Sequence, residues 1–140
     1  HLVNLSSVFG MIAVPTQSAY NAAKFAVRGY TEALRMEMAG SSVHVCCVHP
    51  GGIKTNIARD ARGGDPAVSA EQRHSDFEKV AGTSADAAAQ KIVHAIERRK
   101  PRLLIGRDAV LIALLTRLFP VHYARILRLL VDTGDVLKTP

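Results

Sequence analysis

The chain has 140 residues, of which 48% are hydrophobic and 21% charged, an ordinary composition for one globular domain with a buried core. The formal net charge of +6 is unevenly spread: residues 1–90 hold eight basic and eight acidic side chains, whereas residues 91–140 hold ten and four. Only Phe119 and Tyr123 are aromatic near that basic excess, and no DNA- or RNA-binding motif accompanies it, which argues against nucleic-acid binding. The six histidines are scattered and give no metal-ligand spacing.

The first expected element is a strand at Leu2–Leu5, where a short apolar run with little alternation is typical of a parallel strand buried on both faces. Ser6 and Ser7 end this strand. A serine in such a place ordinarily makes a turn hydrogen bond, and we keep that structural role for Ser6.

A loop over residues 10–17 and then a long helix follow the first strand. We expect either Thr16 or Ser18 to be the capping residue of the helix. The helix is expected to run to about Ala39 and to stop at Gly40, because glycine commonly ends a helix.

Near the start of this helix, Tyr20 and Lys24 are four residues apart, a spacing that places both side chains on one helical face. A tyrosine is normally too weak an acid to exchange protons at neutral pH, but a fixed cation favours the phenolate. Such a pair could protonate a developing alkoxide or deprotonate an alcohol. Alone, the spacing is a weak signal, because any amphipathic helix can contain it by chance.

A second buried strand is expected at Val43–Val48, which is apolar and rich in β-branched residues. Its adjacent Cys46 and Cys47 point to opposite faces of a strand, so they form a poor disulfide pair and behave as small buried hydrophobes. The run of residues 49–55 lies at the C-terminal end of this strand, which is where α/β sheets bind ligands.

Two further elements are expected after a long polar stretch. Residues 56–82 show no sustained periodicity and are expected as a long loop. Residues 83–86 have the pattern of a helix start, with a capping residue and an acid in the first turn, and the helix continues to Arg99. A third short strand is expected over residues 102–106.

From Asp108 onward, uncharged apolar residues are interrupted by arginines. The uncharged run of residues 109–116 is far shorter than the roughly 20 residues that span a bilayer. A basic amphipathic segment could instead lie on an anionic membrane surface or cover a lipophilic substrate pocket. We favour a pair of C-terminal helices that caps the core of the subunit.

Taken in order and spacing, Leu2–Gly10, Ser18–Val27 and Val43–Thr55 closely resemble the C-terminal half of a short-chain dehydrogenase/reductase. The resemblance is strong over residues 1–55 and loose after that. It implies an α/β fold, the C-terminal half of a Rossmann-like doubly wound parallel sheet with three parallel strands and flanking helices. The implied division is a catalytic half-domain at 1–106 and a C-terminal amphipathic helical extension at 107–140.

The resemblance also implies roles for individual residues. Ser7 lies thirteen residues before Tyr20 and would orient the substrate oxygen, Tyr20 would be the acid/base, and Lys24 would bind the nicotinamide ribose and favour the phenolate. The implied cofactor is NAD or NADP. Its implied contacts are Tyr20, Lys24, Pro50, Gly51, Ile53 and Thr55, with no metal. The substrate would be a small alcohol or carbonyl compound, and residues 56–82 would be its lid.

The family's glycine-rich phosphate turn, its Asn-Asn-Ala-Gly turn and its catalytic asparagine are missing from this sequence. The chain therefore resembles a fragment whose other half binds most of the nucleotide, so dinucleotide binding by this chain alone is expected to be weak or absent. A catalytically incomplete fragment and a peripheral membrane module stay as alternatives. The family further implies a homo-oligomer that pairs through the long helix, and we expect a cytoplasmic location.

Overall fold

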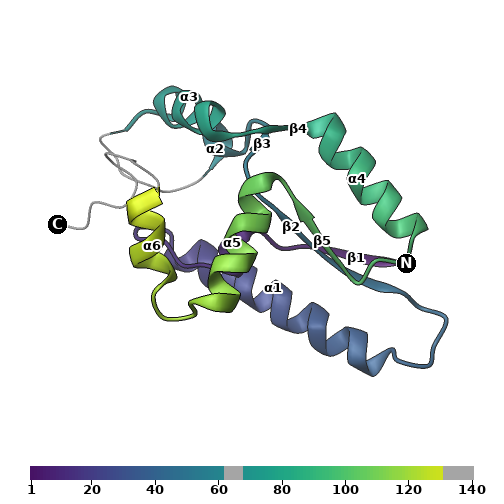
Figure 1. Cartoon of the computed structure of the whole chain (residues 1–140). Helices are drawn as coiled ribbons and strands as arrows, with labels where there is room; N and C mark the ends of the chain where they lie inside the picture. Colours follow the sequence, from purple (N-terminus) through teal and green to yellow (C-terminus); the bar gives the residue numbers. More distant parts are fainter. Residues whose placement is uncertain (62–67, 131–140) are drawn as a thin grey trace.

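In the computed structural model, which describes residues 1–61 and 68–130, three parallel strands form a sheet with helices on both faces (Figure 1). The strand order is β1-β2-β5, and the register pairs Leu2 with Val45 and Cys47 with Arg102. The predicted α/β fold with three parallel strands is confirmed. The strands are β1 (Leu2–Leu5), β2 (Val45–Pro50) and β5 (Arg102–Ile105), with the short parallel pair β3 (Ile53–Lys54) and β4 (Thr83–Ser84).

In the part of the chain that the structure describes, seven helical segments connect and cover these strands: η1 (Val8–Gly10), α1 (Ser18–Glu37), α2 (Ile57–Asp60), α3 (Ala70–Val80), α4 (Ala85–Glu97), α5 (Arg107–Leu118) and α6 (Tyr123–Leu130). Helix α4 lies on one face of the sheet, and α1 and α5 lie on the other (Figure 1). The α4 face buries the apolar cluster of Cys46, Val48, Ala88 and Ile105. On the opposite face, α5 and η1 share a second cluster of Val8, Met11 and Ala109.

The C-terminal helices pack on the rest of the chain, as the favoured interpretation of this region predicted. Ala109 of α5 is completely buried against η1, and the Tyr123 hydroxyl of α6 accepts a hydrogen bond from the Ala13 backbone N–H at 3.1 Å. Residues 131–140 of the predicted extension lie outside the described residues.

Several predicted boundaries of elements are wrong, among them the cap of α1 and both ends of β2. The α1 cap is Gln17, with no side-chain cap hydrogen bond, whereas Thr16 has a φ of 65° and Ser18 is already helical. Strand β2 begins at Val45 rather than at Val43, whose N–H bonds the Ser41 hydroxyl in a turn. Pairing with β5 then keeps β2 extended through Pro50.

The strand β1 and the predicted lid also differ from expectation. Strand β1 is only half-buried and Leu5 is exposed, because within the described residues β1 pairs with β2 alone. Residues 56–82 contain α2 and α3 rather than a continuous loop; residues 62–67 of this stretch lie outside the described residues. Helix α3 lacks an apolar stripe, and local bonds stabilise it instead, namely a Ser69 cap to Gln72 N–H and side-chain bonds of Asp76 with Gln72 and Lys79.

Candidate active site

The predicted catalytic residues gather where β1 ends and α1 begins. Ser7 follows β1 and starts η1, where its Oγ accepts a hydrogen bond from the Phe9 N–H at 3.1 Å. Ser6 is buried, and its Oγ donates to the Lys24 carbonyl of α1 at 2.8 Å. Ser6 therefore ties the strand end to the helix, whereas Ser7 is only partly buried.

Tyr20 and Lys24 lie together on α1, as their spacing predicts. The Lys24 Nζ is 5.5 Å from the Tyr20 ring centroid and donates to the Leu5 carbonyl at 3.2 Å. The Phe9 ring packs edge-on against the Tyr20 ring, with centroids 5.9 Å apart. Lys24 and Phe9 thus orient the phenol of Tyr20. Because Tyr20 is also 36% exposed, its side chain remains accessible to a ligand.

Phe9 connects the two predicted catalytic hydroxyl groups. Its N–H donates to the Ser7 Oγ and its ring contacts the Tyr20 ring, so the conformation of η1 links the position of the serine to that of the phenol. Within residues 1–61 and 68–130, no hydrogen bond joins the Ser7 and Tyr20 hydroxyls directly.

The predicted cofactor turn after β2 is held by backbone bonds and by Asp108. The Gly51 N–H donates to the Ile105 carbonyl, and the Gly52 N–H donates to Asp108 Oδ2, both at 2.8 Å. A Cβ atom on Gly51 would overlap the Asp108 carboxylate, so glycine is needed there for close approach. Asp108 was not among the predicted site residues; its position in the first turn of α5, just after a buried strand, was the available signal.

The remaining predicted cofactor contacts lie along the same turn. Pro50 ends β2, and Ile53 is half-buried against the α4 cluster through the β3–β4 pair. The Thr55 hydroxyl is exposed just before α2, and within the described residues it makes only long contacts, to the backbone of Ile53 and Ile57 at 3.4 and 3.5 Å. Thr55 is therefore free to bind another acceptor or donor.

Asn21 is a buried side chain that the sequence analysis did not single out. Its Nδ2 donates to the carbonyls of Phe9 and Ile12 at 3.1 and 2.9 Å, and its Oδ1 accepts from the Val14 N–H at 3.3 Å. Asn21 thus fastens η1 and the following loop to α1, next to Tyr20. The only sequence signal was a poor helix former in the first turns of a helix.

His49 is the second such residue, and it is completely buried at the end of β2. Its Nδ1 lies 3.2 Å from the Ser7 carbonyl oxygen. Burial lowers the pKa of His49, and the charges of Arg102 and Arg28 lower it further against the opposing effects of the Ser7 carbonyl and Glu32. In the described part of the chain, no three His, Cys, Asp or Glu side chains could hold a metal ion.

Comparison with known protein sequences identifies a family model and several relatives that match this chain. A family model described as short chain dehydrogenase matches residues 1–65. SadH of Mycobacterium tuberculosis, which is named as an oxidoreductase, is 48% identical over 130 residues, covering 90% of this chain and 46% of SadH. The dehydrogenase/reductase SDR family member 7B of Xenopus tropicalis is 36% identical, covering 88% of this chain and 39% of that protein. The chain thus spans less than half the length of these curated relatives.

Solved structures show the same fold. A short-chain dehydrogenase from Streptomyces avermitilis matches with a TM-score of 0.59 and 31% identity, covering 95% of this chain and 51% of that one. A short chain dehydrogenase/reductase from Burkholderia phymatum, solved in complex with NAD, matches with a TM-score of 0.69 and 23% identity, covering 99% and 52%. A short chain dehydrogenase from Burkholderia cenocepacia, solved with NADP, gives 0.64 and 22%, covering 94% and 48%.

Proposed function

Because the chain belongs to the short-chain dehydrogenase/reductase family, we propose that it supplies the catalytic side chains of an NAD(P)-dependent oxidoreductase that interconverts an alcohol and a carbonyl. The observation that carries this proposal is the joint placement of Ser7, Tyr20 and Lys24 where β1 ends and α1 begins. A hydroxyl, a phenol and a cation at one place are the groups that proton transfer to an oxygen needs.

Each of the three residues has a separate task in this proposal. Tyr20 exchanges a proton with the substrate oxygen, and Lys24, 5.5 Å from its ring, stabilises the phenolate that forms. Ser7 donates a hydrogen bond that orients the same oxygen. Lys24 is itself held by the Leu5 carbonyl, so its charge stays beside the phenol rather than in solvent.

The cofactor is proposed to be NAD or NADP, in agreement with the dinucleotides in two structural relatives. When bound, the nicotinamide ring gives or takes the hydride. Tyr20, Lys24 and the turn of Pro50, Gly51, Ile53 and Thr55 would contact it. These groups fit such a role, because the Lys24 cation of α1 and the exposed Thr55 hydroxyl of the turn offer complementary groups to ribose and phosphate.

Tyr20→Phe tests the mechanism, in a protein that joins this chain to an N-terminal dinucleotide-binding half. Turnover should fall by about 10²- to 10⁴-fold, the usual contribution of a general acid–base, while cofactor affinity stays within a few-fold. Tyr30→Phe is the matched control, because Tyr30 is an exposed phenol further along the same helix. Steady-state rates on a panel of ketones and alcohols give the answer, and equal turnover in both variants would refute the mechanism.

We further propose that this chain by itself is catalytically incomplete. The sequence holds no glycine-rich phosphate turn, so NADH or NADPH should bind only weakly and turnover should be absent. Calorimetric titration with both nucleotides measures this. Micromolar affinity, about −8 kcal/mol, would mean that the chain binds the nucleotide on its own.

A homo-oligomer is the proposed assembly state. Within the described residues β1 pairs on one side only, which leaves backbone donors and acceptors at an apolar edge. Helix α1 also exposes a face that includes Ala22, Ala26 and Tyr30. We expect light scattering of this chain at micromolar concentration to report a species above 15.1 kDa, and a stable monomer would contradict the proposal. The cytoplasmic location stays a prediction.

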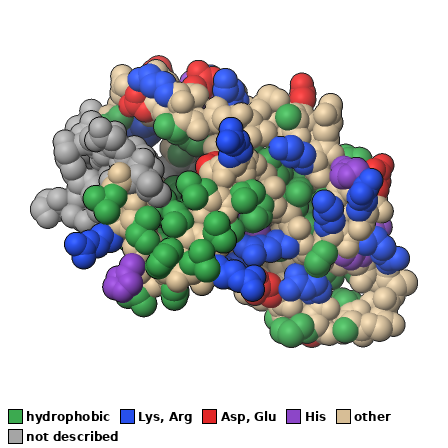
Figure 2. All heavy atoms as spheres, viewed as in Figure 1, with side chains coloured by type: hydrophobic (Ala, Val, Ile, Leu, Met, Phe, Trp, Pro, Cys, Tyr) green, Lys and Arg blue, Asp and Glu red, His purple; other side chains and the backbone are tan. Residues whose placement is uncertain are grey.

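An anionic membrane surface is a second candidate partner, because α5 exposes apolar side chains within a basic region. Val110, Leu111, Leu114 and Leu118 are exposed on α5, and Figure 2 shows a hydrophobic patch with Lys and Arg side chains beside it. A hollow of about 490 Å³ between α4 and α5 is lined by three of them together with Lys91 and Arg107. Within the described residues, no helix is long and apolar enough to cross a membrane.

Vesicle co-sedimentation tests this surface contact. The protein should bind vesicles of phosphatidylglycerol and phosphatidylcholine but not of phosphatidylcholine alone, and salt should weaken the binding. Leu114→Glu should abolish it, whereas Val80→Glu, at an even more exposed apolar residue on α3, should leave it unchanged. Equal binding to both vesicle types, or by both variants, would exclude the proposed contact.

A further inference from the structure

The Ser7 carbonyl lies where β1 has left the sheet. The last ladder bond runs from the Ser6 N–H to the Val48 carbonyl at 2.8 Å. One residue later, the Ser7 carbonyl faces two donors: the Gly10 N–H at 3.0 Å and the His49 Nδ1 at 3.2 Å. His49 follows Val48 directly, so its side chain continues the connection between β1 and β2 after backbone pairing has ended.

The hydrogen-bond chemistry defines the form of His49. A carbonyl oxygen only accepts, so the hydrogen must be on Nδ1, and Nε2 of the neutral ring then carries none. The ring is completely buried, and its Nε2 has no partner within the described residues. A buried imidazole without an ion-pair partner is stable as the neutral ring, which agrees with its lowered pKa.

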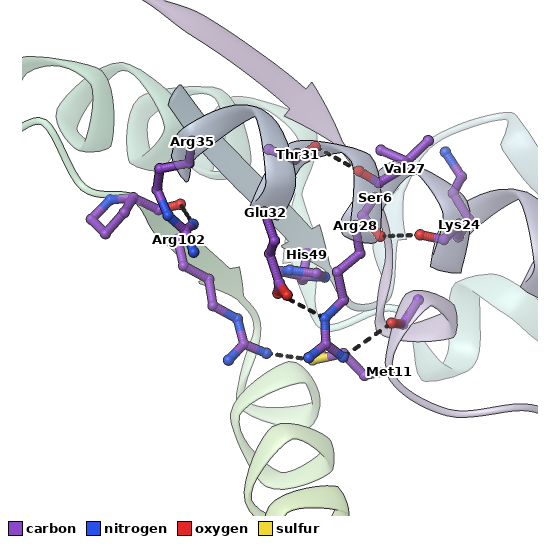
Figure 3. Close-up of polar contacts among 12 residues, drawn as sticks. Ser6, Met11, Lys24, Val27, Arg28, Thr31, Glu32, Arg35, His49 and Arg102 are labelled. Carbon is purple, nitrogen blue, oxygen red and sulfur yellow. Dashed lines mark hydrogen bonds and ion pairs between the residues drawn. The ribbon is translucent and has the colours of Figure 1, made fainter. Parts of the chain in front are cut away.

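The charged neighbours of His49 form their own bonds to other groups and leave the bond between His49 and Ser7 in place. Figure 3 shows His49 beside Arg28 and Glu32 of α1, with Arg102 approaching from β5. Arg28 is bound to Glu32 at 2.9 Å and to the Gly10 carbonyl at 3.4 Å, and Arg102 donates to the Met11 sulfur at 2.8 Å. Gly10 ends η1 and Met11 follows it, so the two arginines also hold the segment that Ser7 begins.

We infer that His49 is a positioning residue, which fixes the Ser7 carbonyl through its Nδ1–H and so sets the direction of the Ser7 hydroxyl toward the substrate oxygen. The inference rests on the proposed catalytic role of Ser7. His49 itself is completely buried and does not touch substrate. A shift of Ser7 would move its hydroxyl away from the substrate oxygen, and misplacement of a catalytic group by about 1 Å can cost on the order of 100-fold in rate.

Three variants test the inference in the protein that carries both halves. His49→Leu removes the donor, and kcat should fall by about 10- to 100-fold with little change in the KM for the nucleotide. His49→Asn keeps an N–H donor and should recover turnover to within a few-fold of the unmodified protein. Thr31→Val is the control, since Thr31 is equally buried in the same layer but bonds Asn4 and the Val27 carbonyl instead.

A double-mutant cycle separates positioning from general damage to the fold. If His49 acts through Ser7, then His49→Leu should cost less than about threefold in a Ser7→Ala background, because coupled residues are not additive. An additive loss, or a His49→Asn variant no better than His49→Leu, would overturn the inference. NMR of the labelled imidazole gives a check that needs no turnover: the hydrogen should be on Nδ1, and a hydrogen on Nε2 would equally overturn it. Failure of the proposed function would appear separately, as full turnover in Tyr20→Phe.

Discussion

The two faces of the sheet are built in different ways. The face under α4 is closed by Cys46, Val48, Ala88 and Ile105, all apolar and all buried. The face under α1 contains every buried polar side chain in the described part of the chain, namely Ser6, Asn21, Thr31 and His49. The predicted catalytic residues lie at the end of this second face.

The contrast shows which kind of force specifies the site. Apolar burial stabilises without direction, so the α4 face needs only suitable volume and shape. Hydrogen bonds have direction, and a buried partner left unpaired is expensive, so they fix one arrangement. On the α1 face these bonds join separate segments: Asn4 to Thr31 at 3.0 Å, and Ser6 to the Lys24 carbonyl at 2.8 Å.

Replacing Asn21 should have the largest effect on this contrast. Asn21→Leu keeps a side chain of similar size but leaves the Phe9 and Ile12 carbonyls and the Val14 N–H without their partner. The bond to Ile12 is buried and the other two are partly buried. At about 1–3 kcal/mol for each unsatisfied buried group, the free energy of unfolding should fall by about 3 kcal/mol. Denaturant titration measures this.

Turnover of the protein that carries both halves should fall as well, because Phe9 contacts Ser7 and Tyr20. The control is Gln90→Leu on α4, an exposed amide side chain, which should change stability by less than about 0.5 kcal/mol. A loss in Asn21→Leu that is no greater than in the control would show that the polar face is not held by these bonds.

A smaller effect is expected on the apolar face. Ile105→Val removes one methylene from a completely buried side chain in the α4 cluster, which should lower the free energy of unfolding by about 0.5–1.5 kcal/mol. Turnover should stay within twofold, since no directional bond to the site is lost. A large loss of activity with so small a change in stability would mean that the two faces are coupled.

The sequence predicted the apolar part of the fold well. Parallel strands are often continuous apolar runs, which is why β1, β2 and β5 could be located, although only β2 is buried along nearly its whole length. Ser84 caps α4, as the pattern of residues 83–86 predicted. Helix α3 could not be predicted from periodicity, because it is held by a cap and by polar pairs rather than by an apolar stripe. The cap of α1 was misplaced because Asn21 orders the preceding loop.

The candidate site was predicted only where a motif was local. Tyr20 and Lys24 are four residues apart on one helix, and the structure brings them together. The hydrogen-bond partner of His49 is Ser7, which lies 42 positions away, so this contact depends on the completed fold. Asp108 likewise meets the Gly51–Gly52 turn only after β5 has paired with β2. The roles of these residues in catalysis stay predictions.

The smallest expected effect concerns pH, and it also separates the two faces. Burial lowers the pKa of His49 below its ordinary value; Arg28 and Glu32 of α1, Arg102 of β5 and the Ser7 carbonyl are its neighbours. Below pH about 6.5 the unfolded chain protonates this histidine while the folded one still does not. The unfolded state then binds more protons, so the free energy of unfolding falls with falling pH.

His49→Asn should therefore lose part of this acid-side slope, as measured by denaturant titrations between pH 5 and 8. Cys46→Ala on the apolar face is the control: burial raises the pKa of that thiol, which thus titrates above the same range and leaves the slope unchanged. Parallel curves for the unmodified protein and His49→Asn would show that His49 does not titrate differently in the folded and unfolded states. A reduced slope in His49→Asn alone would locate the pH sensitivity on the polar face.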